Sequence, residues 1–135
     1  MALKHCITAA LIGTGLVTAV ATAAPASAYT IRTTGQTRAT PRLAADVLTA
    51  VSRYSKATGS CSFVFSADMR VMPARYTPTQ RVYRVRQMGG HYELWLVNAC
   101  ARKQVFEVAM WPSPRGGSDF AVVPVTGTMP LHTRW

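Results

Sequence analysis

The stretch RVYRVRQMGGHYELWLVNAC, residues 81–100, decides the fold that the sequence predicts, because two runs of alternating polar and apolar residues flank a glycine pair. Glycine pairs favour the two-residue turns that join the strands of a β-hairpin. A turn centred on Gly89 and Gly90 therefore predicts two antiparallel strands in a fixed register. Because successive side chains of a strand point to opposite sides, that register sorts the stretch into two faces.

The two faces of this predicted hairpin differ in chemistry. The apolar face, which we expect to line the core, contains Tyr83, Val85, Leu94, Leu96 and Cys100. The opposite face is polar and aromatic and contains Arg84, Arg86, His91, Glu93 and Trp95. In this register Arg86 lies opposite Glu93, and Arg84 lies opposite Trp95. One apolar and one polar face are what a half-buried antiparallel sheet requires.

A helix is expected ahead of the hairpin, over residues 41–57. Thr40 is a hydroxyl residue suited to capping a helix N-terminus, and Pro41 suits the first helical position. Apolar residues then recur at helical spacing, namely Leu43, Val47, Leu48, Val51 and Tyr54. Lys56 and Gly59 are typical of a helix end. We expect the apolar stripe of this helix to pack on the core.

Two shorter strands are also predicted, one between the helix and the hairpin and one after the hairpin. CSFVF, residues 61–65, alternates and places Cys61, Phe63 and Phe65 on one side. DFAVVPV, residues 119–125, reads as the last strand. Its Pro124 has no N–H group to donate to a ladder, so this strand should lie at an edge or be bulged there.

A further strand is predicted over residues 104–111, QVFEVAMW, with Phe106, Val108 and Met110 pointing inward. A five-residue loop that pairs Cys100 with Phe106 keeps the apolar faces together and places Trp95 opposite Trp111 on the outer face. A turn at residues 102–103 would break that match. The longer loop is therefore favoured.

Residues 1–28 predict a secretory signal peptide, with the basic Lys4, an apolar stretch of small residues and an A-x-A cleavage site at residues 26–28. An uncleaved membrane anchor is the alternative, because the apolar run is about long enough to span a bilayer. Cleavage leaves no transmembrane segment, and we expect a periplasmic or extracellular protein. It would consist of an N-terminal arm or edge strand over residues 29–40, a domain over residues 41–125 and a tail over residues 126–135.

The two cysteines outside the leader, Cys61 and Cys100, are expected to form a disulfide, because exported proteins meet an oxidising environment. The sequence thus predicts an α+β domain in which one N-terminal helix packs on a four- to five-stranded antiparallel meander held by one disulfide. The helix is expected on the face that carries the cysteines.

The chain is strongly basic, with 15 Lys and Arg against 5 Asp and Glu and a net charge of +10. This balance favours an anionic partner, such as a phosphorylated glycolipid, an acidic protein surface or nucleic acid. The alternative is a coding bias toward arginine, which would carry no functional meaning.

Motifs of known chemistry are absent from the sequence, which has no nucleophile elbow, phosphate-binding glycine loop, H-E-x-x-H or pair of C-x-x-C motifs. We expect no metal, no cofactor and no enzymatic activity. One constellation supports an alternative, because His91 and Glu93 would share a face with Arg84 and Arg86. Such a set could supply a general acid, a general base and cationic stabilisers to a metal-independent, ribonuclease-like hydrolase or toxin acting on nucleic acid.

A binding site is predicted on the outer face, at Arg84, Arg86, Trp95 and Trp111, because Trp and Arg are enriched where proteins bind one another. A face this apolar is seldom left open. The partner would be an anionic or amphipathic protein or another envelope component, and the chain would be a non-enzymatic binding or accessory protein, or a subunit of an envelope or secretion assembly. Alternatively, the arm or the tail, with Met129, Leu131 and Trp135, covers this face.

Residues 93–120 also resemble small exported bacterial proteins of uncharacterised function. The matching residues are Trp95, Val97, Cys100, Phe106, Val108, Gly116 and Gly117. Ala101 stands where those proteins usually have glycine. The resemblance implies a secreted or periplasmic setting in a Gram-negative bacterium, and it implies no activity.

Overall fold

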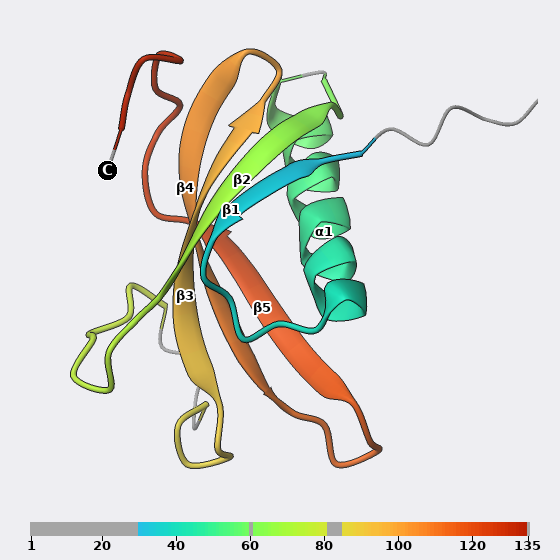
Figure 1. Cartoon of the computed structure of the whole chain (residues 1–135), viewed down its shortest axis with the longest axis vertical. Coiled ribbons are helices and arrows are strands. Elements are labelled where there is room, and N and C mark those ends of the chain that lie inside the picture. The colour runs from blue at the N-terminus through green and yellow to red at the C-terminus, as the bar shows by residue number, and fades with distance from the viewer. Residues whose placement is uncertain (1–29, 60, 81–84, 135) are drawn as a thin grey trace, which may run out of the picture.

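The protein forms one helix and a five-stranded sheet in the computed structural model, which describes residues 30–59, 61–80 and 85–134 (Figure 1). The elements in chain order are β1 (Arg32–Gly35), α1 (Pro41–Gly59), β2 (Val64–Val71), β3 (His91–Ala99), β4 (Arg102–Pro112) and β5 (Ser118–Pro124). The strands lie side by side in the same order, β1-β2-β3-β4-β5. The predicted α+β class with one helix is confirmed.

Strand β1 makes the sheet mixed, because it runs parallel to β2 while every other neighbouring pair is antiparallel. The expectation of a purely antiparallel meander is therefore wrong. The physical reason is that α1 connects β1 to β2, and a parallel pair requires such a crossover to carry the chain back to the same end.

Helix α1 begins and ends close to its predicted bounds and lies across one face of the sheet (Figure 1). The Leu43 N–H donates to Thr40 Oγ1 at 3.2 Å, so Thr40 caps the helix as expected. Val47 and Val51 are fully buried. They pack against side chains of β2, β3 and β4, which are Val64, Ala67, Met69, Trp95, Val97, Phe106, Val108 and Met110.

The predicted hairpin around the glycine pair does not form. Glu93 pairs with Val71 of β2 on one side and with Val108 of β4 on the other, so the expected pairing of Glu93 with Arg86 is wrong. Val85 begins a turn that ends at Gly90, whose N–H donates a 2.7 Å hydrogen bond to the Val85 carbonyl. Glycine is required at position 90 because a Cβ there would collide with the Met110 carbonyl of β4. Residues 81–84, which include the predicted Tyr83 and Arg84, lie outside the described residues.

The connection between β3 and β4 is a two-residue turn at Cys100 and Ala101, because Ala99 pairs with Arg102. The expected five-residue loop is wrong, and Trp95 pairs with Phe106 instead of Trp111. A change of register by an odd number of residues exchanges the faces of a strand. Trp95 and Val97 therefore face α1, whereas Leu94 and Leu96 point to the opposite side.

The side chains at the start of β2 point to the sides opposite to those expected. Its register shifts between Val64 and Ser66, which is the irregularity of a bulge. Val64 is buried, while Phe63 and Phe65 are 54% and 44% exposed, so the inward placement predicted for these aromatic residues is wrong. The rings of Phe63 and Phe65 stack on each other with centroids 6.1 Å apart.

The edge position of the last strand and the disulfide were both predicted from the sequence. Strand β5 lies at one edge, as Pro124 requires, and β1 at the other. The predicted disulfide between Cys61 and Cys100 is present, with Cα atoms 5.9 Å apart, and it ties the chain before β2 to the β3–β4 turn. In the described part of the chain, no helix is long and apolar enough to cross a membrane.

Candidate binding site between the helix and strand β1

The structure does not assemble the four residues predicted to bind a partner. Trp95 is fully buried beneath α1, whereas Trp111 lies on the opposite face and packs against a small cluster around Tyr92. Arg86 shares that opposite face, with its guanidinium 5.7 Å from the centre of the Tyr92 ring. Arg84 lies outside the described residues. Of the predicted set, only Arg86 and Trp111 are placed on one side of the sheet.

The acid and base candidates are also separated from Arg86. His91 Nε2 hydrogen-bonds to Glu93 Oε1 at 3.0 Å, and Glu93 is fully buried on the face that α1 covers. The same carboxylate accepts hydrogen bonds from Thr37 Oγ1 at 2.7 Å, from the Arg38 N–H at 2.7 Å and from Trp95 Nε1 at 2.8 Å. Glu93 thus anchors the 36–40 loop, and its oxygens have no access to a substrate.

The face away from α1 is covered in part by the segment that follows β2. Glu107 is buried on this face and accepts hydrogen bonds from Tyr76 Oη at 2.6 Å, from the N–H and Oγ1 of Thr79 at 2.9 and 3.2 Å, and from the Gln80 N–H at 3.0 Å. Burial and the bond to Glu107 raise the pKa of Tyr76 to about 12. The tail lies beside β4, because Met129 forms a bridge with Lys103 and Lys103 Nζ donates to the Thr133 carbonyl at 2.7 Å.

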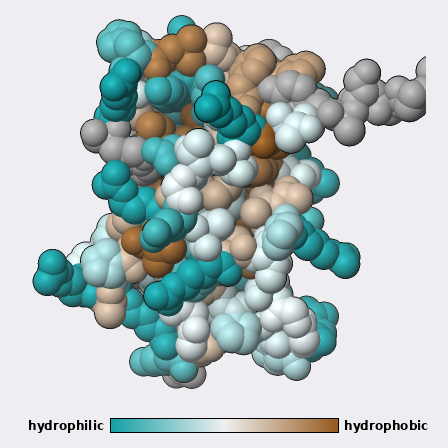
Figure 2. Space-filling model, in the orientation of Figure 1, coloured by the Kyte–Doolittle hydropathy of each residue, from teal (hydrophilic) through white to brown (hydrophobic). Residues whose placement is uncertain are grey.

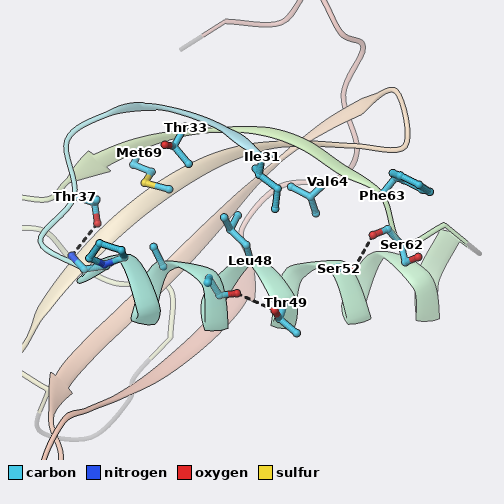
Figure 3. A pocket seen from close by; sticks show the side chains of 14 residues that line it. Ile31, Thr33, Thr37, Leu48, Thr49, Ser52, Ser62, Phe63, Val64 and Met69 are labelled. Carbon is cyan, nitrogen blue, oxygen red and sulfur yellow. Dashed lines mark hydrogen bonds between the residues drawn. The ribbon is translucent and has the colours of Figure 1, made fainter. Parts of the chain in front are cut away.

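An open apolar groove lies instead between α1 and β1, and it encloses a cavity of about 740 Å³ (Figure 3). Its apolar lining includes Ile31, Leu48, Phe63, Val64 and Met69. Its hydroxyl groups come from Thr33, Thr37, Thr49, Ser52 and Ser62. The volume falls in the range of roughly 300–1,000 Å³ that is typical of binding clefts. In Figure 2, white to brown residues fill the area between β1 and α1, and teal groups project around it.

Small residues leave this groove open. Ala44 and Ala45 line it along the first turns of α1, so no large side chain of the described residues fills the gap there. Strand β1 is only four residues long and is exposed throughout. Figure 3 shows Leu48 pointing from the helix toward Ile31, across the middle of the groove.

Three of the five hydroxyl groups along the groove donate within the chain. Thr49 Oγ1 donates to the Ala45 carbonyl at 2.8 Å, and Ser52 Oγ donates to the Ser62 carbonyl at 2.6 Å. Thr37 Oγ1 donates to Glu93 and accepts from the Ala39 N–H at 3.0 Å. These side chains are held as fixed, satisfied groups. The groove is suited to holding apolar groups.

The segment that contains β1 and α1 is basic. Residues 30–59 carry five basic side chains, Arg32, Arg38, Arg42, Arg53 and Lys56, against the single acid Asp46, and all six are exposed. In the ranges that the structure describes, no group of three or more His, Cys, Asp and Glu could hold a metal ion.

No family model matches the chain, and no curated protein or solved structure matches it. The functional inference therefore depends on the geometry of the groove. Sequence reasoning assigned its walls to an arm and to a core-facing helix stripe. The signals that could have located it are the alternation of Ile31 and Thr33 beside the helix and the small pair Ala44 and Ala45 on the helix.

Proposed function

We propose that the protein is an exported, non-enzymatic binding protein that holds a segment of another polypeptide in the groove between α1 and β1. The observation that carries this proposal is the open apolar cavity of about 740 Å³ beside an exposed edge strand. The predicted signal peptide supports export, and so does the disulfide, because such bonds persist in oxidising compartments.

The shape of the groove favours a polypeptide over a small molecule. Its helix wall runs from Pro41 to Ser52, which corresponds to roughly 16 Å at the rise of an α-helix. Small-molecule sites fix their ligands with a few directed polar groups. The donors of Thr37, Thr49 and Ser52 are already used within the chain, so the groove offers mainly apolar surface.

The partner should be acidic or should carry acidic residues beside its apolar ones. Five cations and two acids, Asp46 and Asp68, lie between Ile31 and Met69, the part of the chain that forms the groove. Opposite charges across an interface accelerate encounter and exclude wrongly charged partners. This role replaces the outer-face site expected from the sequence, because Trp95 is buried and Glu107 holds residues 76–80 over that face.

The test uses two matched variants of exposed helix alanines. Ala45 lines the groove and Ala57 does not, so Ala45→Trp should obstruct the groove while Ala57→Trp leaves it open. Peptides selected from a phage-displayed random library on the purified protein should bind Ala45→Trp at least about tenfold more weakly and Ala57→Trp unchanged, a difference of roughly 1.4 kcal/mol. Failure to select any peptide, or equal binding to both variants, would contradict the proposal.

The alternative of a ribonuclease-like hydrolase has its own assay. Purified protein should not cleave RNA above the background of an identically purified His91→Ala variant. Cleavage that disappears in His91→Ala would overturn the non-enzymatic proposal.

A further inference from the structure

We infer that the bound segment adds to β1 as a sixth strand of the sheet, with apolar side chains turned into the groove and acidic side chains turned away from α1. This inference rests on the proposed function, and it specifies the conformation and the chemistry of the partner. An extended peptide that extends a sheet gains affinity from main-chain hydrogen bonds and specificity from its alternate side chains.

The outer edge of β1 is available for such pairing. Strand β1 pairs with β2 on one side and, among the described residues, with no strand on the other. The Gln36 N–H donates to the Met69 carbonyl of β2 at 2.9 Å. Because the backbone groups of successive strand residues point to opposite edges, Arg32 and Thr34 face β2, while Ile31 and Thr33 present N–H and C=O groups at the open edge. Those groups are a template for another strand.

Side chains of β1 show where those of a sixth strand would point. Ile31 and Thr33 line the groove, whereas Thr34 turns to the other face, where its Oγ1 lies 3.2 Å from Asp68 Oδ1. A strand paired with β1 continues the same alternation. Its alternate residues would therefore enter the groove above Leu48. The roughly 16 Å of helix wall matches about five extended residues, close to the length of β1.

Acidic residues are favoured at the other positions of the added strand. Arg32 is exposed and lies on the face away from α1, so it would adjoin side chains of the new strand that point outward. Opposite charges on neighbouring strands attract each other, and like charges repel. A second copy of the chain is disfavoured as the occupant for the same reason, because it would bring another Arg32 and another charge of +10 to the edge.

The experiment compares synthetic peptides of equal composition. One alternates valine and glutamate over about eight residues, a common strand length, and the other groups the valines together. The alternating peptide should bind at least about tenfold more tightly. Methylating its backbone nitrogens at one set of alternate residues should abolish binding, whereas methylation at the other set should be tolerated, because only one set donates to β1.

Amide exchange locates the pairing directly. On peptide binding, the exchange of the Ile31 and Thr33 amides should slow by about tenfold or more, while the amides of Arg32 and Thr34, which face β2, should change little. Arg32→Glu should weaken binding of the acidic peptide by about threefold to tenfold, as expected for one cross-strand charge pair. Arg115→Glu, an equal charge change in the β4–β5 turn, is the control and should have little effect.

The outcomes separate the two proposals. Library peptides that bind and respond to Ala45→Trp, but ignore alternation and backbone methylation, would overturn strand addition and leave groove binding intact. Absence of any peptide binder would overturn both. Self-association of the free protein that is accompanied by slowed exchange at Ile31 and Thr33 would identify a second copy as the occupant and overturn the acidic partner.

Discussion

Glu93 and Glu107 occupy diagonal positions on the neighbouring strands β3 and β4, and their buried carboxylates point to opposite faces of the sheet. Each is the acceptor of four hydrogen bonds, Glu93 from two residues of the loop before α1 and two of its own strand, and Glu107 from the segment after β2. A buried charge is tolerated when its hydrogen-bonding capacity is satisfied in this way. One carboxylate on each face thus fastens one loop to the sheet.

Replacing Glu93 with Gln should destabilise the fold by about 2–4 kcal/mol, because the new amide N–H₂ would meet donors where an oxygen now accepts. Urea-induced unfolding measures the effect. Asp46→Asn, which neutralises an exposed carboxylate on α1, is the control and should change the free energy of unfolding by less than about 0.5 kcal/mol. Equal effects of the two changes would show that the Glu93 hydrogen bonds contribute little.

Stability should fall at alkaline pH through Tyr76. Its folded-state pKa, raised to about 12 from an ordinary value of 10.0, means that the folded protein holds this proton more tightly than the unfolded chain does. The contribution is therefore complete below pH 10 and is lost as the pH rises from 10 through about 12. Tyr76→Phe should flatten the decline of unfolding free energy over this window, and an unchanged slope would contradict the assignment.

Ala101→Gly should stabilise the protein by about 1 kcal/mol, because a left-handed backbone conformation costs a residue with a Cβ about that much. Ala101 has a φ of 59° in the β3–β4 turn. The matched change Ala45→Gly, in the interior of α1, should destabilise by a similar amount. Thermal or urea unfolding of both variants tests the contrast in sign, and destabilisation by Ala101→Gly would refute it.

The two tryptophans of the predicted binding face should respond very differently to truncation. Trp95→Ala should cost about 3–5 kcal/mol, because it empties a fully buried core site. Trp111→Ala should cost clearly less, since Trp111 is only partly buried on the other face. Urea unfolding of each single variant is the measurement. Similar losses from the two changes would contradict the assignment of Trp95 to the face beneath α1.

Reduction of the Cys61–Cys100 disulfide should lower stability by about 4 kcal/mol in the chain-entropy model, since the bond closes a loop across 39 positions of sequence. Unfolding with and without a thiol reductant gives the difference. A Cys61→Ser/Cys100→Ser double variant should match the reduced protein. Two free thiols detected by mass in the native protein would refute the pairing.

Features with a local signal could be predicted from the sequence. The cap at Thr40 and the helical spacing after it located α1, because both depend on residues within one or two turns. Pro124 placed β5 at an edge because its missing N–H is a property of that residue alone. The cysteine pair followed from counting, since only two cysteines lie outside the predicted leader.

Features that depend on distant partners could not be predicted. The strand 91–99 alternates equally well whichever neighbours it has, so its pattern did not reveal that β2 and β4 occupy both of its edges. Which side chains of this strand face α1 then depended on the turn at Cys100 and Ala101. Both residues have positive φ angles, which neither residue type favours, so the turn could not be recognised from the sequence. The groove could not be predicted for the same reason. It forms only because β1 pairs in parallel with β2, and α1 connects the two strands.

The two ends of the groove are held by bonds of different strength. At the Phe63 end, the disulfide fixes the wall covalently to the β3–β4 turn. The Cys100 N–H also donates a 3.0 Å hydrogen bond to the Phe63 carbonyl. At the Thr37 end, hydrogen bonds hold the 36–40 loop, and they run to Glu93 and to the Met69 carbonyl. The groove is thus held more rigidly at its Phe63 end than at its Thr37 end. We expect it to be selective for the size of the residue bound near Phe63 and tolerant of bulk near Thr37.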